Sequence, residues 1–161
     1  MVRRAVAAVV LATLLAGCLG DSRRSEDPGL LAPSSLEKAA RRATFPARLP
    51  APLEEQKLLN VAWVTADDGS VGQLSFDLVA PGGRIVTVDQ AADATSGLVR
   101  SLVADATPLG PWQIGAERWK AYRAPLLAGL LLVNRDEGGV ETAVSGNASL
   151  QTLATVAASL R

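Results

Sequence analysis

Two runs of alternating apolar and polar residues, joined by a tight turn, constrain the fold of this chain more than any other feature. Residues 71–79 and 84–90 each place apolar side chains at every second position, which is typical of strands with one buried and one wet face. Pro81-Gly82-Gly83 supplies the turn between them, and residues 58–64 form a further candidate strand. Together the three runs predict an antiparallel meander.

The remainder of the chain predicts more short strands and several helices. Pro108, Gly110 and Pro111 are expected to interrupt the chain before the later strands. Ser149 is the expected N-cap of the last helix, which carries a continuous apolar stripe. Strands are expected at residues 112–114, 119–123, 126–134 and 139–145, and helices at residues 34–43, 95–104 and 149–160.

These elements define an α+β class. We expect a curved antiparallel sheet of about five to seven short strands, packed by the C-terminal helix and accompanied by a short N-terminal helix. Trp63, Trp112 and Trp119 are expected to be core or edge anchors, because core placement of tryptophan is commoner than a ligand platform.

The short N-terminal helix carries a patterned set of charges. Ser34 and Glu37 have the spacing of a capping box at its start. Lys38, Arg41 and Arg42 lie toward its end, where cations interact favourably with the helix dipole. Contact with lipid headgroups is a second interpretation of these three basic residues.

The first 17 residues have the pattern of an export signal. Arg3 and Arg4 precede an uncharged, mostly apolar run at residues 5–15. Such a run is too short to span a hydrocarbon core of ~30 Å, which needs about 20 residues, so it is typical of a signal peptide rather than a permanent membrane helix. The two arginines favour retention of the N-terminal end on the cytoplasmic side.

The apolar run ends in Leu15-Ala16-Gly17-Cys18, which resembles a bacterial lipobox. The resemblance implies that Leu15, Ala16 and Gly17 are recognised by the signal peptidase, that a diacylglyceryl group is attached to Cys18, and that the chain is cleaved before it. Two acyl chains give stable membrane anchoring, whereas one gives only marginal binding. Whether Cys18 is additionally N-acylated stays open.

The sequence therefore divides into three parts. Residues 1–17 are the expected lipoprotein signal peptide, residues 18–44 comprise the lipidated Cys18, a flexible tether and the short helix, and residues 45–161 form an α+β envelope domain. Removal of Arg3 and Arg4 leaves 14 basic against 16 acidic residues, a net charge of −2. Such a charge gives no attraction to an anionic membrane, so the lipid is the expected anchor.

Composition excludes several kinds of chemistry. The chain has no histidine and one cysteine, so it has no Ser-His-Asp or Cys-His catalysis, no intramolecular disulfide and no His- or Cys-based metal site. We expect no catalytic residues, no metal and no cofactor. A net charge of zero over the whole chain argues against nucleic-acid binding, which requires clustered basic residues.

Acidic residues are the remaining candidates for a site. Asp67, Asp68, Asp136 and Glu137 are expected at hairpin tips, where solvated turn acids are commoner than a Ca²⁺ site. Asp89 and Asp93, which flank Gln90 closely, are expected on a polar sheet face or in contact with a partner. Their spacing leaves open whether either pairs with a second acid.

Short patterns follow one another in order from residue 45 to the C-terminus. They are Phe45-Pro46, Leu49-Pro50, Leu74-Ser75-Phe76, Ile85-Val86-Thr87-Val88-Asp89-Gln90, Trp119-Lys120-Ala121-Tyr122, Gly139-Val140-Glu141-Thr142-Ala143-Val144-Ser145-Gly146, and the final helix with Leu150, Leu153, Ala154 and Leu160. The pattern resembles small actinobacterial envelope proteins of the domain of unknown function 4245 family, and the related 4367 module of some anti-sigma-type membrane proteins. The resemblance implies an envelope location and carries no catalytic residues; members are often held by a transmembrane helix, which the lipobox replaces here.

These observations favour a non-enzymatic binding module, lipid-anchored at the extracytoplasmic face of the cell membrane through Cys18. Its expected partner is an envelope protein, a wall component or a lipid, and not a nucleic acid. One alternative is a carrier of lipid or a small apolar ligand, which would require an open cavity lined by leucine and valine. A hydrolase that uses carboxylates, or a Ser with a Lys, is a further alternative.

Overall fold

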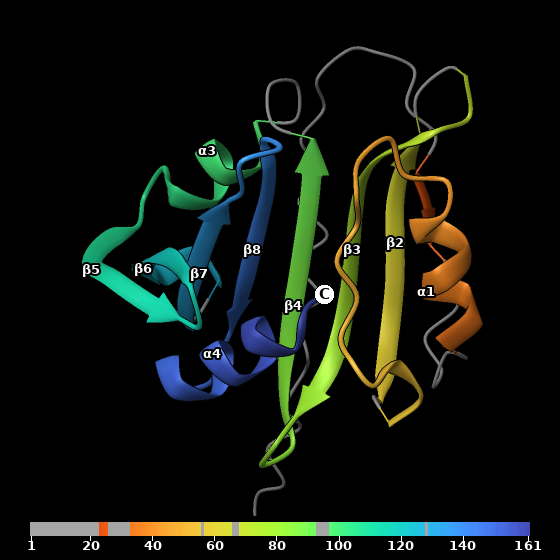
Figure 1. The fold of residues 1–161 in the computed structure, drawn as a ribbon. Coiled ribbons are helices and arrows are strands. Elements are labelled where there is room, and N and C mark those ends of the chain that lie inside the picture. The colour runs from red at the N-terminus through yellow and green to blue at the C-terminus, as the bar shows by residue number, and fades with distance from the viewer. Residues whose placement is uncertain (1–22, 26–32, 56, 66–67, 93–96, 128) are drawn as a thin grey trace, which may run out of the picture.

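A single antiparallel sheet forms the centre of the computed structural model, which describes residues 23–25, 33–55, 57–65, 68–92, 97–127 and 129–161. The strand order is β1-β2-β3-β4-β8-β7-β6-β5, and every pairing is antiparallel (Figure 1). The strands are β1 (Arg23–Ser25), β2 (Leu58–Thr65), β3 (Val71–Ala80), β4 (Arg84–Ala92), β5 (Thr107–Ile114), β6 (Glu117–Ala124), β7 (Gly129–Arg135) and β8 (Val140–Gly146).

The sheet consists of two meanders joined in the middle. One meander contains β2, β3 and β4, and the other contains β5, β6, β7 and β8, with β4 and β8 paired between them. The described helices are α1 (Pro33–Ala40), α3 (Leu98–Val103) and α4 (Leu150–Ser159), and short 3-10 turns occur at η1 (Leu53–Glu55) and η2 (Pro125–Leu127). The predicted α+β class, with a curved antiparallel sheet, a C-terminal helix and a short N-terminal helix, is confirmed.

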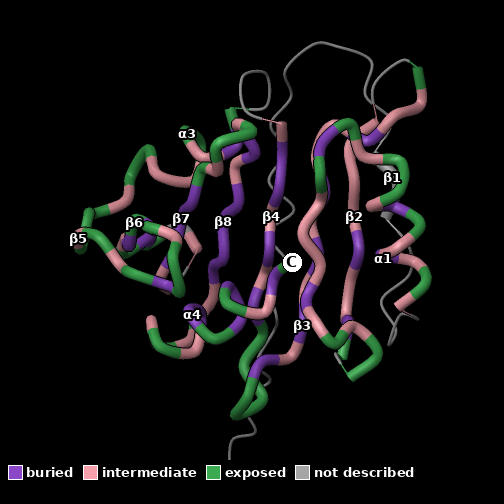
Figure 2. The backbone as a smooth tube through the Cα atoms, viewed as in Figure 1, coloured by how far each residue is buried: buried purple, intermediate pink, exposed green. Residues whose placement is uncertain are grey.

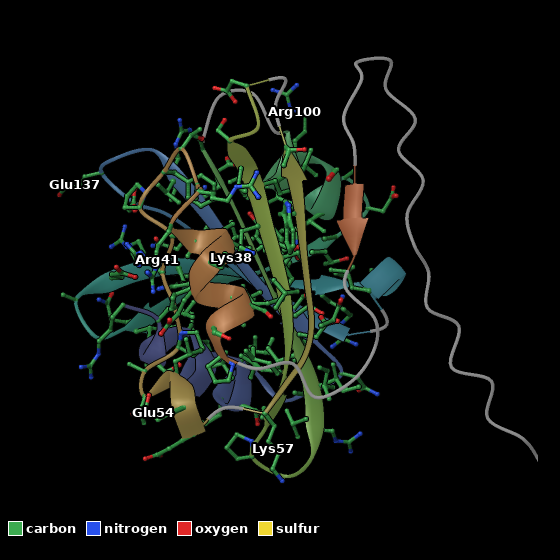
Figure 3. All side chains as sticks on the ribbon, turned by 90° about the vertical axis from the view of Figure 1, so that its right-hand side faces the viewer. Lys38, Arg41, Glu54, Lys57, Arg100 and Glu137 are labelled. Carbon is green, nitrogen blue, oxygen red and sulfur yellow. The ribbon has the colours of Figure 1, made fainter. Side chains whose placement is uncertain are left out.

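Helices cover the two faces of the sheet unequally. α1, α4 and the segment at residues 41–52 lie over one face, which we call the helical face (Figures 1 and 3). α3 lies on the opposite face, where it contacts β4, β6 and β8. The strands β7 and β8 are the most continuously buried, each with four consecutive buried residues, and Figure 2 shows buried residues in purple.

The main hydrophobic core lies on the helical face. From Leu74 to Ala80 every second residue of β3 is buried there, as the alternation predicted, because successive side chains of a strand point to opposite faces. Val71, also buried, precedes a register shift between β2 and β3. A smaller cluster lies under α3 on the other face, where Val99, Leu102 and Val103 pack against it. The largest fully buried side chains of the main core include Leu36, Leu58, Leu74, Phe76, Leu78, Trp119, Leu132 and Leu153.

The N-terminal helix α1 begins at Pro33, one residue earlier than predicted. Proline suits the first helical position because its missing N–H is not needed there. Ser34 consequently lies inside the first turn, and the prediction that it caps the helix is wrong. Leu36 and Ala39, three residues apart, share the face that packs on β2 and β3.

The C-terminal helix α4 follows the prediction closely. Ser149 is the N-cap, and its hydroxyl accepts a 3.1 Å hydrogen bond from the Thr152 N–H. Leu153 and Ala157 are buried against the sheet. After the helix, the backbone of Arg161 exchanges two hydrogen bonds with Leu49, so the C-terminus is bound to the segment at residues 41–52.

The edge strand β5 is longer than predicted. It begins at Thr107 and includes Pro108, Gly110 and Pro111, which were expected to interrupt the chain. Proline cannot donate to a ladder, but an edge strand has one side without a neighbouring strand, and a register shift at Pro108 and Gly110 accommodates the change in direction. The strand β1 was not predicted, because its residues were expected to belong to the flexible tether. The remaining strands and the helix α3 lie within a few residues of their predicted positions.

Among the residues that the structure describes, no helix combines the length and the apolar character needed to traverse a bilayer.

We predict that Leu153→Ala destabilises the fold by about 2–5 kcal/mol, because it removes a fully buried side chain at the junction of α4 and the sheet. Thr155→Ala, at an exposed position of the same helix, is the matched control and should change stability by less than about 0.5 kcal/mol. Urea denaturation followed by circular dichroism measures both values. Equal losses in the two variants would contradict the packing described for α4.

Candidate functional site

The residues predicted for lipidation and signal-peptidase recognition lie outside the described residues. Leu15, Ala16, Gly17 and Cys18 all precede the first described segment at residues 23–25. Asp67 and Asp93, two of the acidic candidates, are also outside the described residues. The candidate site below consists of residues that the structure describes.

Polar side chains gather on the face of β2, β3 and β4 opposite the helical face. Strand register pairs Asn60 with Asp77, Asp77 with Thr87, and Ser75 with Asp89. Because paired residues of antiparallel strands point to the same side, these side chains form one patch. We call this patch the polar face and define it as Asn60, Ser75, Asp77, Thr87 and Asp89.

Hydrogen bonds within the polar face hold Asp77 in place. The Thr87 hydroxyl donates to Asp77 Oδ1 over 2.6 Å. The Asn60 side-chain amide approaches Asp77 Oδ2 at 3.4 Å, a long and weak contact. Both carboxylate oxygens of Asp77 are thus engaged by neighbouring strands.

Asp89 is the electrostatically unusual member of the polar face. Burial raises the pKa of its carboxyl from 3.8 to about 6, a hydrogen bond with the Ser75 side chain opposes the rise, and the negative charge of Asp77 adds to it. Desolvation and a neighbouring like charge both disfavour the ionised form. Perturbed carboxyls of this kind gather at functional sites more often than elsewhere, which makes the polar face our candidate site.

The arrangement can accept hydrogen bonds or pair with a positive group. A carboxyl with a pKa of about 6 is mostly ionised at neutral pH, yet it is poorly solvated, so a donor or a cation that approaches it would be bound favourably. The expectation that Asp89 belongs to a polar sheet face is confirmed. The structure adds that a second acid, Asp77, lies close to it, a pairing that the sequence spacing left open.

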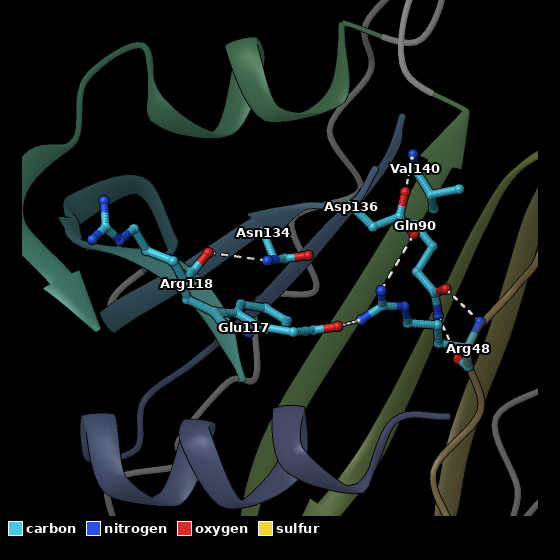
Figure 4. Close-up of polar contacts among 8 residues, drawn as sticks. Arg48, Gln90, Glu117, Arg118, Asn134, Asp136 and Val140 are labelled. Atoms are coloured by element: carbon cyan, nitrogen blue, oxygen red, sulfur yellow. Dashed lines mark hydrogen bonds and ion pairs between the residues drawn. The ribbon is translucent and has the colours of Figure 1, made fainter. Parts of the chain in front are cut away.

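A second polar cluster lies on the helical face, around Arg48 (Figure 4). Its guanidinium contacts Glu117 Oε1 at 2.7 Å and Asp136 Oδ2 at 3.3 Å, and its side chain is 19% exposed. Glu117 also accepts a 3.2 Å hydrogen bond from the Trp119 indole N–H. The Asp136 carboxylate accepts a further bond from the Val140 N–H at 2.9 Å, which closes the β7–β8 turn.

Gln90 fixes the backbone of Arg48. Its side-chain oxygen accepts a 2.7 Å hydrogen bond from the Arg48 N–H, and its amide donates to the Arg48 carbonyl over 2.6 Å. Gln90 is completely buried, so these bonds have no competition from water. The segment at residues 41–52 is held onto β4 by this pair of bonds, which makes the Arg48 cluster a structural clamp.

The hairpin-tip acids behave differently from one another. Asp68 is exposed and accepts a 2.8 Å hydrogen bond from the Ser70 N–H and another from its hydroxyl, which lower its pKa. Glu137 is exposed, whereas Asp136 is part of the Arg48 cluster. Over the described part of the chain, no group of three or more acidic, Cys or His side chains could hold a metal ion.

The three tryptophans lie in or beside the core, as predicted. Trp119 is fully buried and pairs across the β5–β6 hairpin with Trp112, which is half-buried. Trp63 packs against the main core from β2. Of the buried side-chain polar atoms in the described residues, Trp63 Nε1 and Asn134 Oδ1 have no hydrogen-bond partner.

A shallow depression lies beside the start of β7, where the chain enters α4. Its volume is about 440 Å³, and it is open to solvent. A guanidinium and small apolar groups line it: Arg123, Pro125, Gly129, Leu130, Asn147 and Ala148.

Together these features define a small α+β protein with one sheet face packed by helices and a hydrogen-bonded acidic patch on the other. The chain belongs to the family described as Protein of unknown function (DUF4245), whose model matches residues 1–160. The match confirms the expected resemblance and extends it from residue 45 to the N-terminus. No curated protein and no solved structure matches the chain.

We predict that Asp89→Asn stabilises the protein at neutral pH. The pKa of Asp89 in the folded state, about 6, exceeds the ordinary value of 3.8, so the folded state binds the proton more tightly. The free energy of unfolding contributed by this group therefore falls as the pH rises from about 4 to about 6, by at most about 3 kcal/mol. Asparagine cannot ionise, and the variant should gain about 1–3 kcal/mol at pH 7.5 and nothing at pH 4.

Thermal unfolding across this pH range measures the effect. Asp105→Asn, at an exposed position, is the matched control and should change stability by less than about 0.5 kcal/mol. A gain from Asp89→Asn that is the same at pH 4 and pH 7.5 would show that ionisation of Asp89 is not its cause.

We also predict that Gln90→Leu destabilises the protein by about 2–4 kcal/mol, because the Arg48 N–H and carbonyl both lose their hydrogen-bond partner. Amide hydrogen exchange at Arg48 should accelerate together with the loss of stability. Gln113→Leu, on the exposed edge strand β5, is the matched control. Unchanged exchange at Arg48 would exclude the clamp.

Proposed function

We propose that this protein is a lipid-anchored cell-envelope lipoprotein that acts as a non-enzymatic binding module at the outer face of the cytoplasmic membrane. The anchor is the diacylglyceryl group on Cys18, and the partner is an envelope protein, a wall component or a lipid. The sequence supports the anchor through the charged start, the short apolar run and the Leu15-Ala16-Gly17-Cys18 pattern.

The observation that carries the binding role is the polar face. Asp77 and Asp89 lie on adjacent strands, among side chains that all accept or donate hydrogen bonds. The Asp89 carboxyl is already largely desolvated, and an apolar partner would leave its negative charge without a compensating group. The partner therefore presents hydrogen-bond donors or positive charge to this face.

A carrier of lipid or a small apolar ligand is the alternative. The depression beside β7 has the volume that a small ligand needs, at about 440 Å³. Its lining includes one leucine together with Arg123 and Asn147, rather than the continuous leucine and valine surface that a carrier would use. The polar face supports the binding module better than this depression supports a carrier.

A carboxylate-based hydrolase would use the proximity of Asp77 and Asp89. The chain has no histidine to assist them, and the two oxygens of Asp77 already accept bonds from Thr87 and Asn60. Binding a partner that presents hydrogen-bond donors requires only the carboxylate oxygens of Asp77 and Asp89. Binding is therefore the simpler role for these two residues.

The anchor is tested by mass spectrometry of the protein purified from its native membrane. We expect a chain that begins at Cys18, carries a diacylglyceryl group and lacks residues 1–17. Cys18→Ala should retain the signal peptide and lose the lipid. Retention of Met1 in the native protein, or a free Cys18 thiol, would overturn the proposed location.

The binding role is tested by affinity capture from detergent-solubilised envelope. Asp77→Asn combined with Asp89→Asn should reduce recovery of the partner by about tenfold or more, because both carboxylates of the polar face lose their charge. Asp105→Asn combined with Glu137→Gln also removes two negative charges, but from exposed positions outside the polar face, and should leave recovery unchanged. Recovery of bound lipid in place of a partner would favour the carrier.

A further inference from the structure

The strand β1 shows where the chain first meets the sheet within the described residues. β1 pairs with the edge strand β2, with Arg23 opposite Val64 and Ser25 opposite Ala62. Cys18 precedes Arg23 by five residues. Because an extended chain spans at most ~3.6 Å per residue, Cys18 lies within about 18 Å of Arg23. An anchor at Cys18 therefore holds the Val64 end of β2 close to the bilayer.

The basic end of α1 lies at this same end of β2. Arg42 Nη2 donates to the carbonyl of Gly69 over 2.7 Å, and Gly69 belongs to the turn between β2 and β3. The Arg42 carbonyl accepts a 2.8 Å hydrogen bond from the N–H of Val71 at the start of β3. The last turn of α1 and the site from which the anchor emerges are thus neighbours.

The side chains at this end are exposed and mostly basic. Lys38, Arg41 and Arg42 are exposed, and Figure 3 shows Lys38 and Arg41 on α1 at the edge that faces the viewer. Glu37 forms a 3.3 Å ion pair with Arg41, and Asp68 is the exposed acid in the nearby turn. The balance of these five described groups is positive.

The opposite end of the same edge has a negative balance, with two glutamates and one lysine, the exposed Lys57. Glu54 and Glu55 lie in η1, which precedes the first residue of β2, and both are exposed. A strand of eight residues places its two ends about 23 Å apart. Charge is therefore separated along this edge, and the basic end coincides with the end that the anchor reaches.

We infer that the edge formed by β1, β2 and the last turn of α1 faces the bilayer, with Lys38, Arg41 and Arg42 in contact with anionic phosphate-bearing lipid headgroups. This inference rests on the proposed anchoring at Cys18. The lipid chains supply the attachment, and the basic residues select which side of the protein lies against the surface. Each basic side chain close to an anionic surface strengthens the contact about fivefold.

The chain contains three lysines, which allow the orientation to be measured. Lys38 lies in the proposed contact, Lys57 lies near the acidic end of the same edge, and Lys120 lies on β6 in the other meander. Native lipoprotein is bound to preformed vesicles and acylated with a water-soluble amine reagent, and each lysine is quantified by mass spectrometry. Vesicles of phosphatidylcholine alone are compared with vesicles of equal parts phosphatidylcholine and phosphatidylglycerol.

We expect acylation of Lys38 to slow about fivefold on the anionic vesicles, with Lys120 unchanged, and high salt to restore the rate. Arg41→Gln, and Arg41→Gln combined with Arg42→Gln, should progressively remove the protection of Lys38. Arg118→Gln combined with Arg123→Gln removes two exposed positive charges from β6 and should preserve it. Thermal melting of each variant confirms that the fold is retained.

Equal acylation of Lys38 on both kinds of vesicle, or protection of Lys120 in its place, would overturn the orientation. The mass spectrum of the same preparation separates this failure from failure of the anchor. A diacylglyceryl group on Cys18 with unprotected Lys38 rejects the orientation alone. Absence of that group rejects the proposed anchoring, and the orientation with it.

Discussion

The pairing of β4 with β8 is the interaction on which the rest of the structure depends. It joins residues 86–92 to residues 140–146, whereas the other pairings between the longer strands connect consecutive hairpins. Without it the chain would form two separate meanders, and the main core, which takes residues from both, would be divided. Val88 and Val144 meet across this junction on the helical face, and both are fully buried. The non-local pairing therefore creates the surface onto which α4 and residues 41–52 pack.

The same junction makes the two faces of the sheet different. On the helical face, Gln90 lies opposite Thr142 and binds the backbone of Arg48, so even the polar groups there are structural. On the other face, Asp89 lies opposite Ala143, a small residue that contributes no hydrogen bond to the carboxyl. Asp89 is consequently left with Ser75 and Asp77, and its pKa rises. Two residues adjacent in sequence, Asp89 and Gln90, therefore lie in different environments, and Asp89 is the one to which we assign the proposed binding role.

Much of this fold could be predicted from the sequence, because alternation in residues 71–79 and 84–90 fixes which residues share a face. The turn at Pro81-Gly82-Gly83 also fixes the register of the hairpin, because Ala80 lies opposite Arg84 and, three residues further along each strand, Asp77 lies opposite Thr87. Prediction failed at β5, where prolines are tolerated because the strand lies at an edge, and an edge position is a property of the whole sheet. The contacts of Arg48 could not be predicted either, because Arg48 and Asp136 are 88 residues apart in the sequence.

The geometry of the sheet would also separate the proposed attachment from the proposed recognition. β1 and β5 form opposite edges, seven strand spacings apart, or about 34 Å along the sheet. An anchor that reaches the β1 edge leaves the β5 edge far from the bilayer, and the plane of the sheet then stands away from the membrane surface. The polar face, which spans β2 to β4, would in that arrangement be turned sideways rather than toward the lipid. A partner could then approach the polar face without displacing the edge proposed to lie at the membrane, so the proposed anchor and the proposed binding role are compatible in one small domain.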